Sequence, residues 1–282
     1  MPPRQGGCRD RTCWQVPGAP AVASTLRAVL VGFADGSLLG ERWGPEPPAV
    51  VALHGWRRTH ADFTVSLGPG APEGPLPTAA PDLPGFGASP APPEAWGSPE
   101  YAALVAMLIE GLGADPVVVV GHSLGGRVAV RLAARRPDLV RGMVLTGAPV
   151  APRTGPPPRP SAAFRAARGL YRAGLLSEAV MERARQRYGS ADYRAASGVV
   201  RQVLVRMVGE SYADDLALVR CPVELVWGDD DTAAPLAGAR HLAEVLPGAR
   251  LTVCPGAGHL TPLSVPMQLR KATQRLLTGA SA

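Results

Sequence analysis

Short, continuously apolar runs recur along the chain, and each has the length of a β-strand. A strand that is buried on both faces of a parallel sheet shows no alternation of apolar and polar residues, so these runs predict buried strands. Helix-compatible segments separate several of them, and alternating strands and helices are typical of an α/β protein with a parallel sheet. The runs are residues 49–53, 116–120, 143–146, 223–227 and 250–253.

Two further strands are predicted before the first buried run. Apolar residues at 26–33 and 38–43 suit strands, and the Ala-Asp-Gly sequence at 34–36 supplies a tight turn between them. The pattern predicts an antiparallel pair at the start of the domain. One more strand is expected near Thr78–Pro81. It has to be short, because prolines crowd residues 66–80 and proline is poorly tolerated in an inner strand.

The strand signal stops between residues 148 and 220, where a proline-rich stretch is followed by helix-compatible segments. We expect this block to be a helical lid inserted into a single core domain made of residues 26–147 and 221–282. Residues 1–25 carry Pro, Gly and Arg without a sustained period. We expect a loosely ordered tail there.

Composition argues against several other protein classes. Of the 282 residues, 46% are hydrophobic and 18% are charged, as in an ordinary globular domain and unlike a disordered chain. The net charge of +6 comes from scattered arginines, with Lys271 as the single lysine, so we expect no nucleic-acid partner. No run approaches the roughly 20 apolar residues of a membrane span, and the start of the chain lacks a signal-peptide core. We therefore expect a cytoplasmic monomer or homodimer that does not bind a membrane.

The four cysteines do not form a metal-binding pattern. Cys8, Cys13, Cys221 and Cys254 lack the paired spacing of a zinc site. In a reducing compartment they are expected to be free thiols. No metal is expected.

A candidate nucleophile lies between a predicted strand and a predicted helix. Residues 121–125 read Gly-His-Ser-Leu-Gly, which matches the G-x-S-x-G pattern of a nucleophile elbow in the strand–turn–helix context that the pattern requires. Glycines two positions either side of Ser123 leave room for its strained backbone. The helix that follows directs free amides toward developing negative charge, and the Leu124 amide is one expected oxyanion donor.

Five segments together resemble the α/β-hydrolase superfamily. They occur in the order in which that superfamily has them, and the resemblance covers residues 26–277. The resemblance implies a mostly parallel central sheet flanked by helices, with an inserted helical lid, and a serine nucleophile typical of its esterase-like members. The segments are His54-Gly55-Trp56, Asp82-Leu83-Pro84-Gly85-Phe86-Gly87, the elbow at Ser123, Trp227-Gly228-Asp229-Asp230-Asp231 and Gly258-His259.

The resemblance also implies roles for particular residues. Three aspartates follow the predicted strand that ends at Trp227, and the spacing Gly-x-x-Asp in the family selects Asp231 as the acid. His259 stands in a Gly-Ala-Gly-His loop after a late strand and is the expected base. The Trp56 amide would be the second oxyanion donor, while the Trp56 and His122 side chains would contact substrate. His54 is expected to support the oxyanion turn rather than transfer protons.

Together these residues predict a serine hydrolase that cleaves a carboxylic ester, or a related acyl bond, of a small or medium apolar substrate through an acyl-enzyme, without a cofactor. Related enzymes that hydrolyse epoxides or carbon-halogen bonds carry aspartate where this chain has Ser123, so those activities are disfavoured. Cleavage of a carbon-carbon bond, a cofactor-free haloperoxidase-like reaction and a non-catalytic ligand-binding protein stay open as alternatives.

Two arginines follow the expected oxyanion turn. Arg57 and Arg58 would be placed to attract an anionic substrate. Ion pairing with Asp62 or Asp82 is the favoured interpretation.

Overall fold

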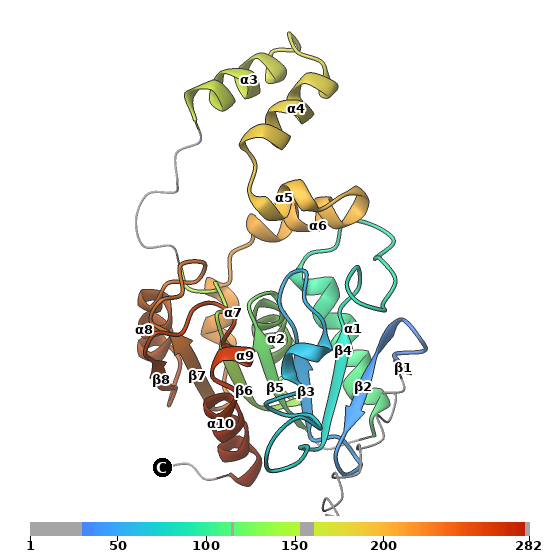
Figure 1. Ribbon diagram of the computed structural model, residues 1–282, viewed down its shortest axis with the longest axis vertical. Coiled ribbons are helices and arrows are strands. Elements are labelled where there is room, and N and C mark those ends of the chain that lie inside the picture. The colour runs from blue at the N-terminus through green and yellow to red at the C-terminus, as the bar shows by residue number, and fades with distance from the viewer. Residues whose placement is uncertain (1–29, 114–115, 153–160, 280–282) are drawn as a thin grey trace, which may run out of the picture.

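An eight-stranded sheet forms the centre of the computed structural model, which describes residues 30–113, 116–152 and 161–279 (Figure 1). The strand order is β1-β2-β4-β3-β5-β6-β7-β8, and every pairing from β4 to β8 is parallel. The expected mostly parallel α/β sheet is confirmed. The strands are β1 (Val31–Phe33), β2 (Leu38–Trp43), β3 (Val50–Leu53), β4 (Thr78–Asp82), β5 (Val117–His122), β6 (Val140–Thr146), β7 (Val223–Gly228) and β8 (Arg250–Cys254).

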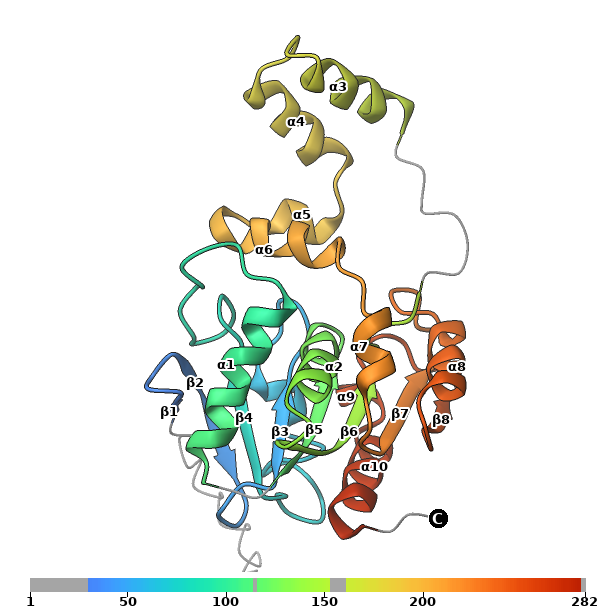
Figure 2. The ribbon, with the colours of Figure 1, turned by 180° about the vertical axis from the view of Figure 1, so that it is seen from behind.

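Helices cover both faces of this sheet. Figure 1 shows α10 in front of the strands, and Figure 2, from behind, shows α1 and α2 on the opposite face. The described helices before β6 are η1 (His60–Phe63), α1 (Ser98–Gly111) and α2 (Leu124–Arg135). Those between β6 and β7 are α3 (Ala162–Arg172), α4 (Glu178–Tyr188), α5 (Ala191–Ala195), α6 (Gly198–Val208) and α7 (Ala213–Leu218). The last three are α8 (Leu236–Val245), α9 (Thr261–Ser264) and α10 (Pro266–Thr278).

The core consists of two apolar layers, one on each face of the sheet. Val119 of β5 belongs to the layer under α1 and α2, whereas its neighbours Val118 and Val120 belong to the layer under α10. All three side chains are fully buried. A strand with both faces buried needs apolar residues at every position, which explains the unbroken valine run. Each buried valine contributes on the order of 1.5–3 kcal/mol relative to an exposed one.

The expected antiparallel pair opens the described part of the chain. β1 and β2 pair with Val31 opposite Gly40 and Phe33 opposite Leu38. Ala34 and Asp35 both have positive φ angles, 47° and 55°, as a tight hairpin turn requires. The predicted start of the first strand, residues 26–29, lies outside the described residues, as do residues 1–25.

β4 is a short strand, as expected, and reaches Asp82. It contains Pro81, although it lies between β2 and β3. The pairing of β4 with β3 ends at Ala79, so Pro81 does not need to donate a backbone hydrogen bond to β3. In β2, the residue opposite Pro81 is Gly40. A Cβ added at Gly40 would lie 2.6 Å from the Pro81 Cα.

Helices α3 to α7 occupy the chain between β6 and β7. In both views α5 and α6 lie beyond the end of the sheet at which β5 meets α2, and α3 and α4 extend farther outward. The proposed lid function of this segment and the limits of 148–220 stay predictions, and the prolines at 156–158 and 160 lie outside the described residues. None of the helices described is long and apolar enough to cross a membrane.

Candidate active site

Ser123 occupies the sharp turn between β5 and α2. Its φ and ψ angles are 51° and −105°, a strained conformation for a residue with a side chain. The turn is held by hydrogen bonds from the Ser123 amide to the Thr146 oxygen and from the Gly125 amide to the His54 oxygen, both 3.0 Å. A Cβ at Gly125 would lie 2.0 Å from the Leu53 oxygen. The glycine is therefore required by the close approach of α2 to β3.

The loop after β8 brings His259 to this serine. His259 Nε2 lies 3.1 Å from Ser123 Oγ, and His259 Nδ1 lies 2.8 Å from Asp231 Oδ2. Ser123 and two residues more than a hundred positions later in the sequence thus form one hydrogen-bonded chain of hydroxyl, imidazole and carboxylate. This is the geometry in which an imidazole can accept a proton from a serine.

Asp231 is held by the backbone as well as by His259. Its Oδ1 accepts hydrogen bonds from the amides of Ala233 and Ala234, at 2.9 and 2.8 Å, and Asp231 is 3% exposed. Oδ2 is left to accept from His259 Nδ1–H, which leaves Nε2 as the acceptor for the Ser123 hydroxyl. The two neighbouring aspartates, 229 and 230, are exposed. Asp231 is the member of the triplet that contacts His259.

The turn after β3 lies directly against Ser123. A Cβ at Gly55 would come within 2.7 Å of His122 Nδ1 and 3.4 Å of Ser123 Cβ. Arg57, inside the turn, has a positive φ of 56°. Within the described ranges, the amides of Trp56 and Leu124 make no hydrogen bond to the protein. The two amides expected to bind an oxyanion therefore have unused donors on either side of the serine.

His54 has the structural position that the sequence analysis expects. Its side chain is fully buried, Nε2 accepts a hydrogen bond from the Leu83 amide at 2.8 Å, and Nδ1 donates to the Gly55 oxygen at 2.8 Å. Burial lowers the pKa of His54 to about 4. A neutral ring with both nitrogens engaged orients the turn and has no capacity left for proton transfer.

The two predicted substrate contacts, Trp56 and His122, are largely covered by protein. His122 is 1% exposed, and its Nε2 donates to the His259 oxygen at 2.9 Å, so it supports the loop that carries His259. Burial lowers the pKa of His122 to about 4. The Trp56 ring contacts Phe86 edge to face, with 4.9 Å between ring centroids. His122 Nδ1 and Trp56 Nε1 are buried without a hydrogen-bond partner among the described residues.

The two arginines of the turn have different partners. Arg58 pairs with Asp62, as expected, and its Nε donates to Asp62 Oδ2 at 2.8 Å. Arg57 instead lies 4.0 Å from Asp192 at the edge of α5. The second contact joins the turn to the helical segment, and no local sequence pattern could have indicated it.

Two polar residues near the turn, Asp82 and His60, are not linked by any sequence pattern. Asp82 belongs to one of the family-like segments and was expected only as a possible partner of Arg57 or Arg58. No role was predicted for His60. The structure brings them into contact. The available signal was a carboxylate at the end of a predicted strand, a position that commonly faces the site edge of a parallel sheet.

Known proteins resemble this chain in sequence. The model of the alpha/beta hydrolase family matches residues 50–272. A pimeloyl-[acyl-carrier protein] methyl ester esterase of Aromatoleum aromaticum is 34% identical over 245 residues, covering 78% of this chain and 94% of that protein. The lipase LipV of Mycobacterium tuberculosis is 45% identical over 116 residues, covering 39% of this chain but only 41% of that lipase.

The fold is also found in solved structures. A thermophilic esterase from Thermogutta terrifontis superposes with a TM-score of 0.64 at 23% identity, covering 90% of this chain and 100% of that chain. The family match contains the Ser123 turn, the Asp231 loop and His259, and it extends over most of the sheet. The chain belongs to the alpha/beta hydrolase family.

Proposed function

We propose that this protein is a serine esterase that hydrolyses carboxylic esters of small or medium apolar acyl groups, with Ser123 as nucleophile, His259 as general base and Asp231 as the acid that orients the base. The observation that carries the proposal is the continuous hydrogen-bonded chain from Asp231 through His259 to Ser123. The same constellation performs acyl transfer on several unrelated folds, so its geometry supports the chemistry independently of the fold.

The reaction follows from the groups in the site. Ser123 Oγ attacks the ester carbonyl carbon while His259 Nε2 takes the hydroxyl proton, and a tetrahedral oxyanion forms. The amides of Trp56 and Leu124 stabilise this oxyanion, and losing one such donor costs roughly 3 kcal/mol in other hydrolases. His259 then delivers its proton to the departing alkoxide. Water attacks the acyl-enzyme by the same route and releases the acid.

The names of the relatives support an ester as substrate. The methyl ester esterase from Aromatoleum aromaticum and a second one from Chromobacterium violaceum are each 34% identical to this chain. The lipase and an esterase of Mycobacterium tuberculosis match the chain over shorter stretches. These names favour hydrolysis of an oxygen ester over cleavage of a carbon-carbon bond.

Hydrolysis of p-nitrophenyl esters tests the proposal. The purified protein is expected to hydrolyse p-nitrophenyl acetate and butyrate faster than the palmitate. Ser123→Ala should lower the turnover by a factor on the order of 10³ or more. Ser37→Ala, which changes an exposed serine in the hairpin turn, should leave turnover unchanged.

The alternatives give different results when the same variants are assayed with these esters and with a vinylogous diketone. A non-catalytic binding protein would show no turnover above background that depends on Ser123. A carbon-carbon bond hydrolase would cleave the esters slowly and a vinylogous diketone rapidly. Either outcome would replace the esterase assignment.

A further inference from the structure

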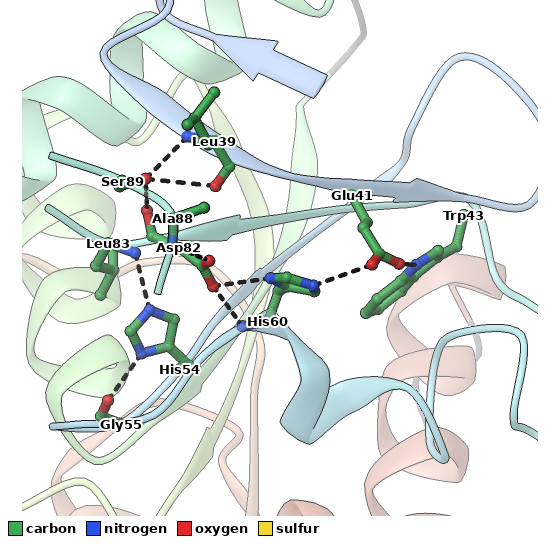
Figure 3. Close-up of polar contacts among 10 residues, drawn as sticks. All are labelled: Leu39, Glu41, Trp43, His54, Gly55, His60, Asp82, Leu83, Ala88 and Ser89. Atoms are coloured by element: carbon green, nitrogen blue, oxygen red, sulfur yellow. Dashed lines mark hydrogen bonds and ion pairs between the residues drawn. The ribbon is translucent and has the colours of Figure 1, made fainter. Parts of the chain in front are cut away.

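A polar network connects the two ends of the oxyanion turn to β4 and β2 (Figure 3). Asp82, at the end of β4, is its centre. Asp82 Oδ1 accepts hydrogen bonds from the His60 amide and from His60 Nδ1, both 2.8 Å long, and Oδ2 accepts from the Ala88 amide at 2.8 Å. A Cβ at Gly87 would lie 2.0 Å from Asp82 Oδ2. The backbone of the motif at residues 82–87 therefore folds back closely around the carboxylate of Asp82.

Two consecutive residues of this motif hold both ends of the oxyanion turn. The Leu83 amide donates to His54, at the start of the turn, and Asp82 accepts from the amide and the ring of His60, just after it. Residues 55–59 connect these two hydrogen-bonded positions, and Trp56, with its backbone amide, is one of them. The position of that amide relative to Ser123 depends on both attachments.

The two histidines are in opposite electrostatic situations. One nitrogen of His54 faces a donor and the other an acceptor, so a neutral ring satisfies both. Both nitrogens of His60 face carboxylates, since Nε2 lies 3.1 Å from Glu41 Oε1 and Nδ1 lies 2.8 Å from Asp82 Oδ1. Only a ring that carries protons on both nitrogens donates to both carboxylates.

The surroundings of His60 favour this charged ring. Its side chain is 14% exposed, and the Glu41 side chain is 16% exposed. The hydrogen bond to Asp82 raises the pKa of His60, and Glu41 adds to this effect, although burial acts against it. Burial acts to raise the pKa of Asp82, but the hydrogen bonds from His60 and Ala88 outweigh it and lower the pKa. Glu41 Oε2 is itself held by Trp43 Nε1 at 2.7 Å.

The elements packed against His60 differ in the charged groups that they bring to it. β2 presents Glu41, β4 presents Asp82, and the end of β3 presents the neutral His54. On its own helix, Asp62 is paired with Arg58. Helix α9, which packs on η1, carries no ionisable side chain. Among the described residues, the charged groups that contact the His60 ring are therefore the carboxylates of Asp82 and Glu41.

We propose that His60 is a positioning residue whose imidazolium, held between Asp82 and Glu41, fixes the oxyanion turn, so that loss of its proton displaces the Trp56 amide and slows turnover at alkaline pH. The inference rests on the esterase function and oxyanion donors proposed above. A displacement of about 1 Å in a catalytic group can lower the rate on the order of a hundredfold. The effect falls on kcat, because an oxyanion donor acts mainly in the transition state.

His60→Gln tests this role, because the amide side chain keeps polar character and cannot carry the charge. The kcat for p-nitrophenyl butyrate is expected to fall about tenfold at pH 7, with KM within about twofold of wild type. Wild-type kcat should decline above the ordinary histidine pKa of about 6.5 as His60 loses its proton. In His60→Gln this decline should be absent. His241→Gln, in α8, is the matched control and should keep the wild-type profile.

Glu41→Gln provides a second test that keeps the histidine. With one carboxylate fewer, His60 should lose its proton more readily, and the alkaline decline of kcat should move down by roughly one pH unit. Glu244→Gln, an exposed change in α8, should not move it. If kcat declines at the same pH in Glu41→Gln and in wild type, the proposed role of the imidazolium is overturned. This test does not require the His60→Gln variant to fold.

Two failures are distinguishable. Turnover that persists in Ser123→Ala overturns the proposed function itself. Turnover that depends on Ser123, together with a His60→Gln variant that matches wild type in kcat and in alkaline decline, overturns the positioning role alone.

Discussion

The Asp231 carboxylate divides its two oxygens between the backbone and His259. One oxygen accepts from the amides of Ala233 and Ala234, and the other lies 2.8 Å from His259 Nδ1. This arrangement fixes which ring nitrogen carries the proton and therefore leaves Nε2 free to accept from Ser123. The carboxylate thus determines the tautomer of His259, the proposed base.

Replacing this carboxylate by an amide should abolish most of the activity. Asp231→Asn is expected to lower kcat by a factor on the order of 10³–10⁴, because an asparagine at this position can stabilise the wrong tautomer of His259. Steady-state hydrolysis of p-nitrophenyl butyrate measures the loss. Asp230→Asn, one residue away and exposed, should retain wild-type kcat. Equal activity of the two variants would remove Asp231 from the mechanism.

Glycine at 125 is predicted to be required for stability. In Gly125→Ala the new methyl would lie 2.0 Å from the Leu53 oxygen, so α2 or β3 must shift at a cost of about 1–3 kcal/mol. Gly111→Ala is the control, because nothing lies within 4 Å of a Cβ there. It is expected to be neutral or to stabilise by about 0.5–1 kcal/mol. Urea unfolding of both variants tests this contrast, and equal midpoints would contradict it.

The buried His54 makes stability dependent on pH. Burial lowers its pKa to about 4 in the folded protein, whereas it titrates near 6.5 when unfolded. The unfolded chain therefore binds the extra proton between these values. The contribution is fully present above about pH 6.5 and is lost as pH falls toward 4, for a total of about 3 kcal/mol.

His54→Asn removes this titration, so its free energy of unfolding should fall less steeply than that of wild type between pH 6.5 and 4. Urea unfolding at several pH values in this window measures the slope. Identical slopes for the two proteins would show that His54 does not titrate as described.

A buried ion pair joins the helical segment to the core. Arg131 of α2 contacts Asp215 of α7, which is 5% exposed, and the Arg131 guanidinium also lies 4.7 Å from the centre of the Tyr212 ring. Asp215→Asn leaves an uncompensated charge and should destabilise the protein by about 3 kcal/mol.

The control for this prediction is Asp138→Asn, which removes the exposed partner of Arg136. The change in unfolding free energy should stay below about 1 kcal/mol. Thermal and urea unfolding compare the two variants. A larger loss in Asp138→Asn than in Asp215→Asn would contradict the proposed anchoring of α7.

Local patterns were sufficient to predict much of the sheet. The unbroken valine run of β5 and the Ala-Asp-Gly turn are consequences of burial and of backbone geometry over a few residues, so sequence reports them directly. β6 begins at Val140, three residues before the predicted start. The exposed Arg141 interrupts the apolar pattern at the start of β6, so the pattern alone does not indicate that the strand begins before it.

Contacts between distant residues could not be predicted in this way. Choosing Asp231 among three aspartates required the family resemblance, because only the fold determines which carboxylate meets His259. The cluster of His60, Asp82 and Glu41 depends on the antiparallel pairing of β2 with β4 and on the path of η1. The partner of Arg57, Asp192, comes from a helix far along the chain. Such contacts are determined by the topology of the fold, and local sequence patterns do not indicate them.

The central claim is that Ser123 is an activated nucleophile, and labelling with a fluorophosphonate probe tests it most directly. Intact-mass spectrometry should find one adduct per wild-type chain, and peptide mapping should place it on Ser123. Ser123→Ala and His259→Ala should stay unlabelled under the same conditions, while Ser37→Ala should label like wild type. An adduct on a different residue, or wild-type protein that stays unlabelled while its fold is intact, would contradict the account.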